Sequence, residues 1–128
     1  MSAQLAEKFL ALVEDLRLNQ KRSPWAKAQE VSGWTKQLAG EVAEVTECID
    51  AGSPEILHLD EELGDVLWTW ISTVVALEEL RGPLMERIIA DTQAKLRHRK
   101  PWVFDPNATL PSTPEEENAI YLRLKSLR

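Results

Sequence analysis

The stretch that decides the fold is DEELGDVLWTWI, which runs from Asp60 to Ile71. Its carboxylates lead into apolar side chains that continue at helical spacing as far as Leu77. This spacing predicts a long helix that is apolar on most of its sides. A single narrow polar strip is left on the helix, formed by Glu62, Asp65, Thr69, Ser72 and Ala76. We expect this strip to meet a partner helix or a pocket, because a helix that faces bulk water carries a broader polar face.

Helical signals continue on both sides of this stretch. Apolar side chains from Leu5 to Leu16 predict a first helix over residues 2 to about 19. Ser23-Pro24 predicts the N-cap and first turn of a second helix that ends at Gly52. Ser53-Pro54 opens the helix that contains the Asp60 stretch. After the break at Arg81-Gly82-Pro83, a fourth helix is expected with Met85, Ile88, Ile89, Thr92 and Leu96 inward.

The end of the chain has a different character. Residues 101–114 contain four prolines, and the capping-box sequence from Thr113 to Glu116 predicts a short helix to about Leu127. No stretch keeps the alternating pattern of a strand. The sequence therefore predicts an all-α fold, with a four-helix bundle core over residues 1–100 and an arm with a short helix over residues 101–128. At 128 residues, both parts are expected to form a single domain.

Composition excludes several classes of protein. Lys and Arg number 15 against 21 Asp and Glu, for a net charge of -6, which disfavours binding to a nucleic-acid polymer. Cys48 is the one cysteine, so no intramolecular disulfide can form. The chain start has no secretory signal pattern, and no apolar run is long enough to span a membrane. We expect a cytoplasmic protein that does not insert into a membrane.

Two pairs of carboxylates stand out by their position on the predicted helices. Glu41 and Glu44 lie about 60° and about 120° from the centre of the apolar stripe of the second helix, as neighbours at i and i+3. Glu62 and Asp65 have the same spacing on the third helix. If the two helices are antiparallel, the four acids can share a hard divalent cation, which would offset their repulsion. The helix dipole and ordinary solvated faces remain alternative explanations for these acids.

Four motifs in the same order resemble the MazG-like nucleotide pyrophosphohydrolases. GEVAEV (40–45) and EELGDVL (61–67), separated by residues 46–60, are similar to the E-x-x-E…E-x-x-D signature of that family. SPWAKAQ (23–29) resembles its C-P-W-x-x-x-Q segment, with Ser23 in place of cysteine. KLRHRKPWVF (95–104) resembles its K-L-x-R-R-x-P-H-V-F segment, with Trp102 in place of histidine. The resemblance extends over roughly residues 23–105.

This resemblance implies an all-α, MazG-like bundle and a specific reaction. Members of the family hydrolyse nucleoside triphosphates between the α- and β-phosphates, releasing a monophosphate and pyrophosphate, in part to clear the nucleotide pool. Carried over by motif, the ligands of Mg²⁺, for which Mn²⁺ can substitute, are Glu41, Glu44, Glu62 and Asp65. Either Glu41 or Glu44 is expected to act as the general base.

The same resemblance assigns the residues that contact the substrate. Lys95 and Arg99 match the K-x-x-x-R of the family and are expected to bind the β- and γ-phosphates. The alternative for these two is a basic last turn that complements the helix dipole. Trp25 and Gln29 are expected at the nucleoside, where the indole would stack on the base. Trp68 fits either the core or a subunit interface.

Apolar residues on several faces also predict a homodimer or a homotetramer built as a dimer of dimers. Two other functions remain open for this sequence. One is a phosphoribosyl-ATP pyrophosphohydrolase, a related enzyme with similar acidic helices. The other is a non-catalytic helical partner or regulatory protein. The four intact ligand positions favour an enzyme.

Overall fold

The computed structural model describes residues 2–52 and 56–127, and all regular structure within them is helical. This confirms the all-α prediction. The chain divides into two compact units, Met1–Leu84 and Met85–Arg128. The expected division of a single domain into residues 1–100 and 101–128 stays a prediction. The predicted start at Ser53-Pro54 lies outside the described residues. No helix in the described part of the chain is long and apolar enough to cross a membrane.

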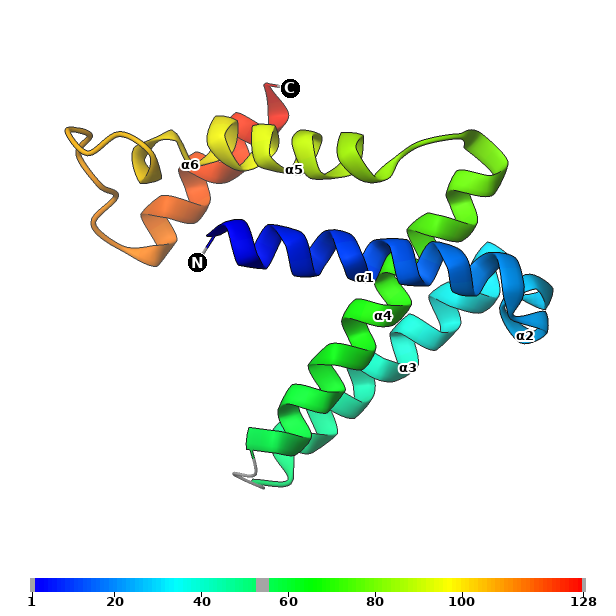
Figure 1. The fold of residues 1–128 in the computed structure, drawn as a ribbon. Coiled ribbons are helices and arrows are strands. Elements are labelled where there is room, and N and C mark those ends of the chain that lie inside the picture. Colours follow the sequence, from blue (N-terminus) through cyan, green and yellow to red (C-terminus); the bar gives the residue numbers. More distant parts are fainter. Residues whose placement is uncertain (1, 53–55, 128) are drawn as a thin grey trace. The chain divides into compact units, whose positions relative to one another are not determined.

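The described part of the first unit contains three long helices and one short one. Helix α3 (Val31–Asp50) and helix α4 (Ile56–Arg81) lie side by side and antiparallel, shown in cyan and green in Figure 1. Helix α1 (Ser2–Arg22) packs on α4, where Arg17 forms a 3.2 Å salt bridge with Glu78. The side chains buried in this unit are mainly Val13, Leu16, Ala26, Trp34, Ile71, Val74, Val75 and Ala76.

The predicted second helix is interrupted, which is a correction to the sequence analysis. Ser23 caps a short helix α2 (Pro24–Ala28) by accepting a hydrogen bond from the Ala26 amide, but Gln29 and Glu30 are extended before α3 begins. Nine residues of continuous helix would separate Trp25 from Trp34 by about 13 Å on opposite sides. Their ring centroids instead lie 5.4 Å apart, in an edge-to-face contact. The interruption is therefore what allows these two rings to pack together.

Two predicted helix ends coincide with glycines in the left-handed region. Gly52 follows α3 with a φ of 65°, and Gly82 follows α4 with a φ of 82°. The Gly82 amide donates to the Glu78 carbonyl, which satisfies one of the free carbonyls at the end of α4. Both breaks in the sequence pattern therefore mark real helix ends.

The second unit consists of α5 (Met85–Arg99), a 3-10 turn η1 (Pro101–Val103) and α6 (Pro114–Ser126). The predicted cap of the last helix is confirmed, since Thr113 accepts a hydrogen bond from the Glu116 amide. The arm between α5 and α6 is ordered by Trp102, whose indole N–H donates to Glu117 at 2.9 Å. Trp102 thus has a structural role in this unit.

Candidate functional site

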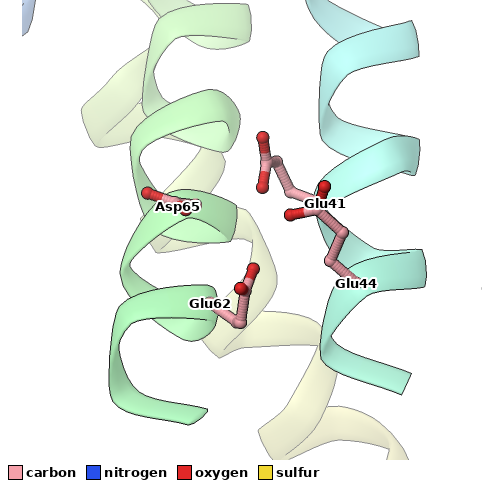
Figure 2. Close-up of side chains that lie close together, drawn as sticks. All are labelled: Glu41, Glu44, Glu62 and Asp65. Atoms are coloured by element: carbon pink, nitrogen blue, oxygen red, sulfur yellow. The ribbon is translucent and has the colours of Figure 1, made fainter. Parts of the chain in front are cut away.

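The antiparallel pairing of α3 and α4 brings two carboxylate pairs together. Glu41 and Glu44 project from α3, and Glu62 and Asp65 project from α4 (Figure 2). One carboxylate oxygen from each residue lies within 4.8 Å of those of the other three. Glu44 is exposed, and the other three side chains are half-buried. The i, i+3 spacing inside each helix is local, but the short distances between the pairs depend on the helix packing.

These carboxylates raise one another's proton affinity. Removal from water raises the pKa of Glu41 above its ordinary value of 4.5, and the charge of Glu44 raises it further. A hydrogen bond with the Glu44 carboxyl is the main cause that raises the pKa of Glu62, and removal from water adds to it. Crowding of negative charge therefore makes the fully ionised cluster unfavourable on its own.

No salt bridge within the described residues offsets this charge. None of the four carboxylates forms an ion pair with a Lys, Arg or His among residues 2–52 and 56–127. Glu41 Oε2 and Glu62 Oε2 are buried, and no amide, hydroxyl or cationic group among the described residues donates to them. Oxygen donors at this spacing, with two buried atoms lacking a partner, fit a hard divalent cation. The cluster can therefore hold a divalent metal.

The polar strip predicted on α4 leads from this cluster into the protein interior. Beyond Asp65, the strip is buried at Thr69, Ser72 and Ala76, as expected for a strip that meets a partner helix. The Thr69 hydroxyl donates to the carbonyls of Asp65 and Val66 within its own helix. At the far end of the strip, Ala76 packs with Trp34 of α3, whereas Glu62 and Asp65 at the near end belong to the acidic cluster.

A pocket of about 310 Å³ adjoins the carboxylates. We call it the tryptophan pocket, and its lining residues are Asn19, Ser23, Trp25, Trp34, Gln37, Glu41, Asp65, Trp68 and Thr69. Glu41 and Asp65 belong both to this lining and to the acidic cluster. The pocket and the candidate metal position therefore form one continuous site within the first unit.

The two residues predicted to contact the nucleoside, Trp25 and Gln29, line different pockets. Trp25 lines the tryptophan pocket, with about half of its surface exposed. Gln29 lines a separate pocket of about 470 Å³, and its side-chain amide donates to the Trp25 carbonyl at 3.4 Å. Its Oε1 lies 2.7 Å from the position that a Cβ on Gly33 would take, so the absence of a side chain at Gly33 makes room for it. The nucleoside contact of Gln29 stays a prediction.

The predicted phosphate ligands lie in the second unit. Lys95 and Arg99 line one pocket of about 470 Å³ on α5, together with Asp91, Ala94 and His98. Arg99 also donates to the Tyr121 hydroxyl at 3.4 Å, and its guanidinium lies 5.8 Å from the centre of that ring. Arg99 lowers the pKa of Tyr121, mainly through this hydrogen bond. The spacing of Lys95 and Arg99 on one face of the helix is as expected, and their phosphate role stays a prediction.

Six lining residues of the tryptophan pocket were absent from the residues predicted to bind substrate or metal: Asn19, Ser23, Trp34, Gln37, Trp68 and Thr69. Gln37 lies one turn before Glu41, and Trp68 lies one turn after Asp65, so helical spacing from the motif acids was a usable signal for both. Asn19 had no such signal, because it reaches the pocket only through the packing of α1. Trp68, with half of its surface exposed, contributes to this pocket rather than to the core of the chain.

Comparisons with known proteins agree with this site. The sequence matches the model of the MazG nucleotide pyrophosphohydrolase domain over residues 29–104, more than half of the chain. The crystal structure of a mazG-related protein from Thermotoga maritima is similar, with a TM-score of 0.78 and 26% sequence identity. That similarity covers 91% of this chain and 97% of the other. No curated protein sequence matches the chain significantly. The matched range contains all four clustered carboxylates.

Proposed function

The chain belongs to the MazG nucleotide pyrophosphohydrolase domain family, and on this premise we propose that it hydrolyses ribo- or deoxyribonucleoside triphosphates to a monophosphate and pyrophosphate. The bond broken is the one between the α- and β-phosphates. The observation that carries the proposal is the cluster of four carboxylates within 4.8 Å, beside a pocket lined by tryptophan. The cellular role that we propose is removal of unwanted nucleotides from the pool.

The metal in this proposal is Mg²⁺, for which Mn²⁺ can substitute. Its ligands would be Glu41, Glu44, Glu62 and Asp65, because hard cations prefer oxygen ligands and these are the clustered oxygen donors. When bound, such an ion offsets the negative charge of the triphosphate, stabilises charge on the phosphoryl oxygens and makes water more acidic.

The chain's own side chains supply the proton transfer and the binding. Glu41 and Glu44 are the two candidates for the general base that accepts a proton from the attacking water. Trp25 and Gln29 would contact the nucleoside, and Lys95 and Arg99 would bind the β- and γ-phosphates.

The active form in this proposal is a homodimer or a homotetramer. Around the carboxylates, the apolar side chains of α3 and α4 are poorly covered: Val42 is 48% exposed, Ile49 60% and Leu63 50%. Exposed apolar surface of this extent on a helix pair favours association with a second copy. Sedimentation at micromolar concentration tests this point, and a monomer there would contradict it.

The reaction is tested with a panel of nucleotides. The purified chain is incubated with ribo- and deoxyribonucleoside triphosphates and phosphoribosyl-ATP, with Mg²⁺ or Mn²⁺, and both pyrophosphate and orthophosphate are measured. We expect pyrophosphate, and no orthophosphate, from at least one nucleoside triphosphate. A preference for phosphoribosyl-ATP would favour the related enzyme instead. Absence of pyrophosphate from every compound would overturn the proposed activity and favour a non-catalytic role.

A further inference from the structure

The tryptophan pocket has a charge distribution that suits an uncharged group. Of its nine lining residues, the charged ones are Glu41 and Asp65, and both are acidic. A phosphate chain would be repelled by this lining unless cations lay between them. The triphosphate therefore belongs on the side of the carboxylates, and the remainder of the pocket is left for the neutral end of the nucleotide.

Aromatic side chains line that remainder. Trp25 is 52% exposed and Trp68 is 50% exposed, so each has ring surface available to a ligand. Trp34 is buried, and its edge-to-face contact with Trp25 holds the Trp25 ring in place at an interplanar angle of 87°. Flat aromatic bases stack well on such rings, and this contact is favourable for every base. The tryptophans supply affinity without selecting a particular base.

The neutral polar side chains of the pocket fall into two groups. The Ser23 hydroxyl accepts from the Ala26 amide, and the Thr69 hydroxyl donates within its own helix, so both are engaged. Asn19 and Gln37 make no side-chain hydrogen bond with any residue in the described ranges. Their carboxamides each offer donors and an acceptor, which is the pattern that distinguishes one base edge from another.

Trp34, which lines the pocket, also carries an unsatisfied donor. The Trp34 indole N–H is buried, and no acceptor among the described residues reaches it. Buried donors are almost always satisfied in proteins, by the chain, by ordered water or by a ligand, and a bound nucleotide base is one source of such an acceptor. Carbonyl oxygens and ring nitrogens of a base are acceptors of this kind.

With the base stacked on Trp25, as the family resemblance implies, we propose that Trp68 supplies a second stacking surface and that Asn19 and Gln37 select which base is accepted. This inference rests on the proposed function, since it names the part of the same site that sets substrate preference. It adds Asn19 and Gln37, which line the tryptophan pocket, to the motif-based contact at Gln29, which lines a different pocket. Selection is thereby assigned to residues outside the family motifs that the sequence analysis used.

The first experiment measures pyrophosphate release as kcat/KM for ATP, GTP, CTP and UTP with Mg²⁺. Gln37→Leu and Asn19→Leu are expected to change the ratio of kcat/KM between the preferred and the second nucleotide by about tenfold or more.

The Gln37→Glu variant removes the donors of the amide and keeps acceptors. It should therefore shift preference toward bases with an exocyclic amino group and away from keto bases. Since all four nucleotides carry the same triphosphate, the ratios cancel any effect on the metal. Gln4→Leu, at an exposed position on α1, is the matched control and should leave the ratios unchanged.

The second experiment needs no turnover. Uncharged nucleosides are added to ¹⁵N-labelled protein, and the tryptophan indole N–H signals are followed. Signals of Trp25, Trp34 and Trp68 should shift, whereas that of Trp70, which does not line the pocket, should not. Gln37→Leu should change the order of affinity among the nucleosides.

The outcomes separate this inference from the proposed function. If the wild-type chain releases pyrophosphate but Gln37→Leu, Gln37→Glu and Asn19→Leu leave the nucleotide ratios unchanged, base selection by these residues is refuted while the activity stands. If no nucleotide is hydrolysed but nucleosides shift the three indole signals in a manner that depends on Gln37, the base site stands and the activity fails. If nucleosides cause no shift and no hydrolysis occurs, both are overturned.

Discussion

The two ends of the α3–α4 helix pair are built in opposite ways. At the core end, Trp34 is 2% exposed and Ile71 is fully buried, and α1 and α2 pack against this end. At the acid end, four carboxylates crowd together within 4.8 Å, and apolar side chains such as Leu63 remain half exposed. The same two helices therefore bury apolar surface at one end and concentrate charge at the other.

The difference separates stability from chemistry along one pair of helices. Burial at the core end supplies the free energy that holds α3 beside α4. The acid end opposes the pairing, because like charges are held close together and partly removed from water. A site of this kind persists only when another part of the structure holds it, so the core end acts as the support of the acid end.

The largest expected effect comes from removing charge at the acid end. Glu41→Gln should lower kcat for pyrophosphate release by about 10²–10⁴-fold, since a proposed metal ligand and a candidate base are lost together. Without metal, the same variant should be at least as stable as the wild type, because one of the repelling charges is gone. Thermal unfolding and the pyrophosphate assay measure the two effects.

Glu47→Gln, at an exposed position on the same helix, is the control and should match the wild type in both assays. An active Glu41→Gln enzyme would place the chemistry elsewhere. An inactive but strongly destabilised variant would contradict the division between the two ends.

At the core end, the large expected effect is on stability instead of on catalysis. Ile71→Ala should lower the free energy of unfolding by about 2–5 kcal/mol, because it leaves a cavity at a fully buried position. Leu63→Ala, at the half-exposed acid end, should cost less than about 1 kcal/mol within one chain. Chemical denaturation at several protein concentrations measures both. A large, concentration-dependent loss for Leu63→Ala would show that a second copy covers the acid end.

The raised pKa values at the acid end determine whether stability rises or falls with pH. The pKa values of Glu41 and Glu62 are raised from 4.5, so the folded chain binds protons there more tightly than the unfolded chain. Their contribution to stability is therefore fully present below pH 4.5 and is lost as the pH rises through the raised pKa values. Without metal, the advantage of Glu41→Gln over the wild type should grow from pH 4.5 to pH 7.

Mg²⁺ should reverse this order, since only the wild type has the complete ligand set. At a concentration 100 times the dissociation constant, it should stabilise the wild type by about 2.7 kcal/mol. Melting curves over this pH range, with Mg²⁺ and with EDTA, provide the measurement. A wild-type melting temperature that does not respond to Mg²⁺ or Mn²⁺ would contradict a metal at the four carboxylates.

The smallest effect is expected at Gly64, beside the carboxylates on α4. Apart from its two chain neighbours and the backbone of its own helix, no atom of the described residues lies within 4 Å of the position that a Cβ would take there. Gly64→Ala should therefore stabilise the helix by about 0.5–1 kcal/mol, because alanine has the higher helix propensity. The denaturant midpoint measures the gain. A loss of stability or of assembly would indicate that another chain approaches the helix at this glycine.

Much of the fold was accessible from sequence, because helix formation depends on local spacing and end signals. The ends at Gly52 and Gly82 and the cap at Thr113 were all predicted from residue type, and the structure confirms them. The break at Gln29–Glu30 was missed. Neither residue is a helix breaker, and the break is favoured by a tertiary contact, the packing of Trp25 against Trp34.

The site was predictable from the sequence to about the same extent as the fold. The two i, i+3 carboxylate pairs follow from helix geometry, and the motif resemblance joined them into one ligand set. Gln37 and Trp68 sit one turn from motif acids but carry no feature that marks them as pocket residues. Asn19 comes from a different helix, so its part in the pocket depends on how α1 packs.

By itself, the sequence determined that this chain is helical, where most helices end, and which face of each helix carries acids. These properties depend on interactions between residues at most a few positions apart. Tertiary structure alone decided that the two acid pairs meet, that α2 separates from α3, and that Asn19, Gln37 and Trp68 line one pocket. Each of these depends on packing between segments distant in the chain, where burial of a few large side chains selects one arrangement.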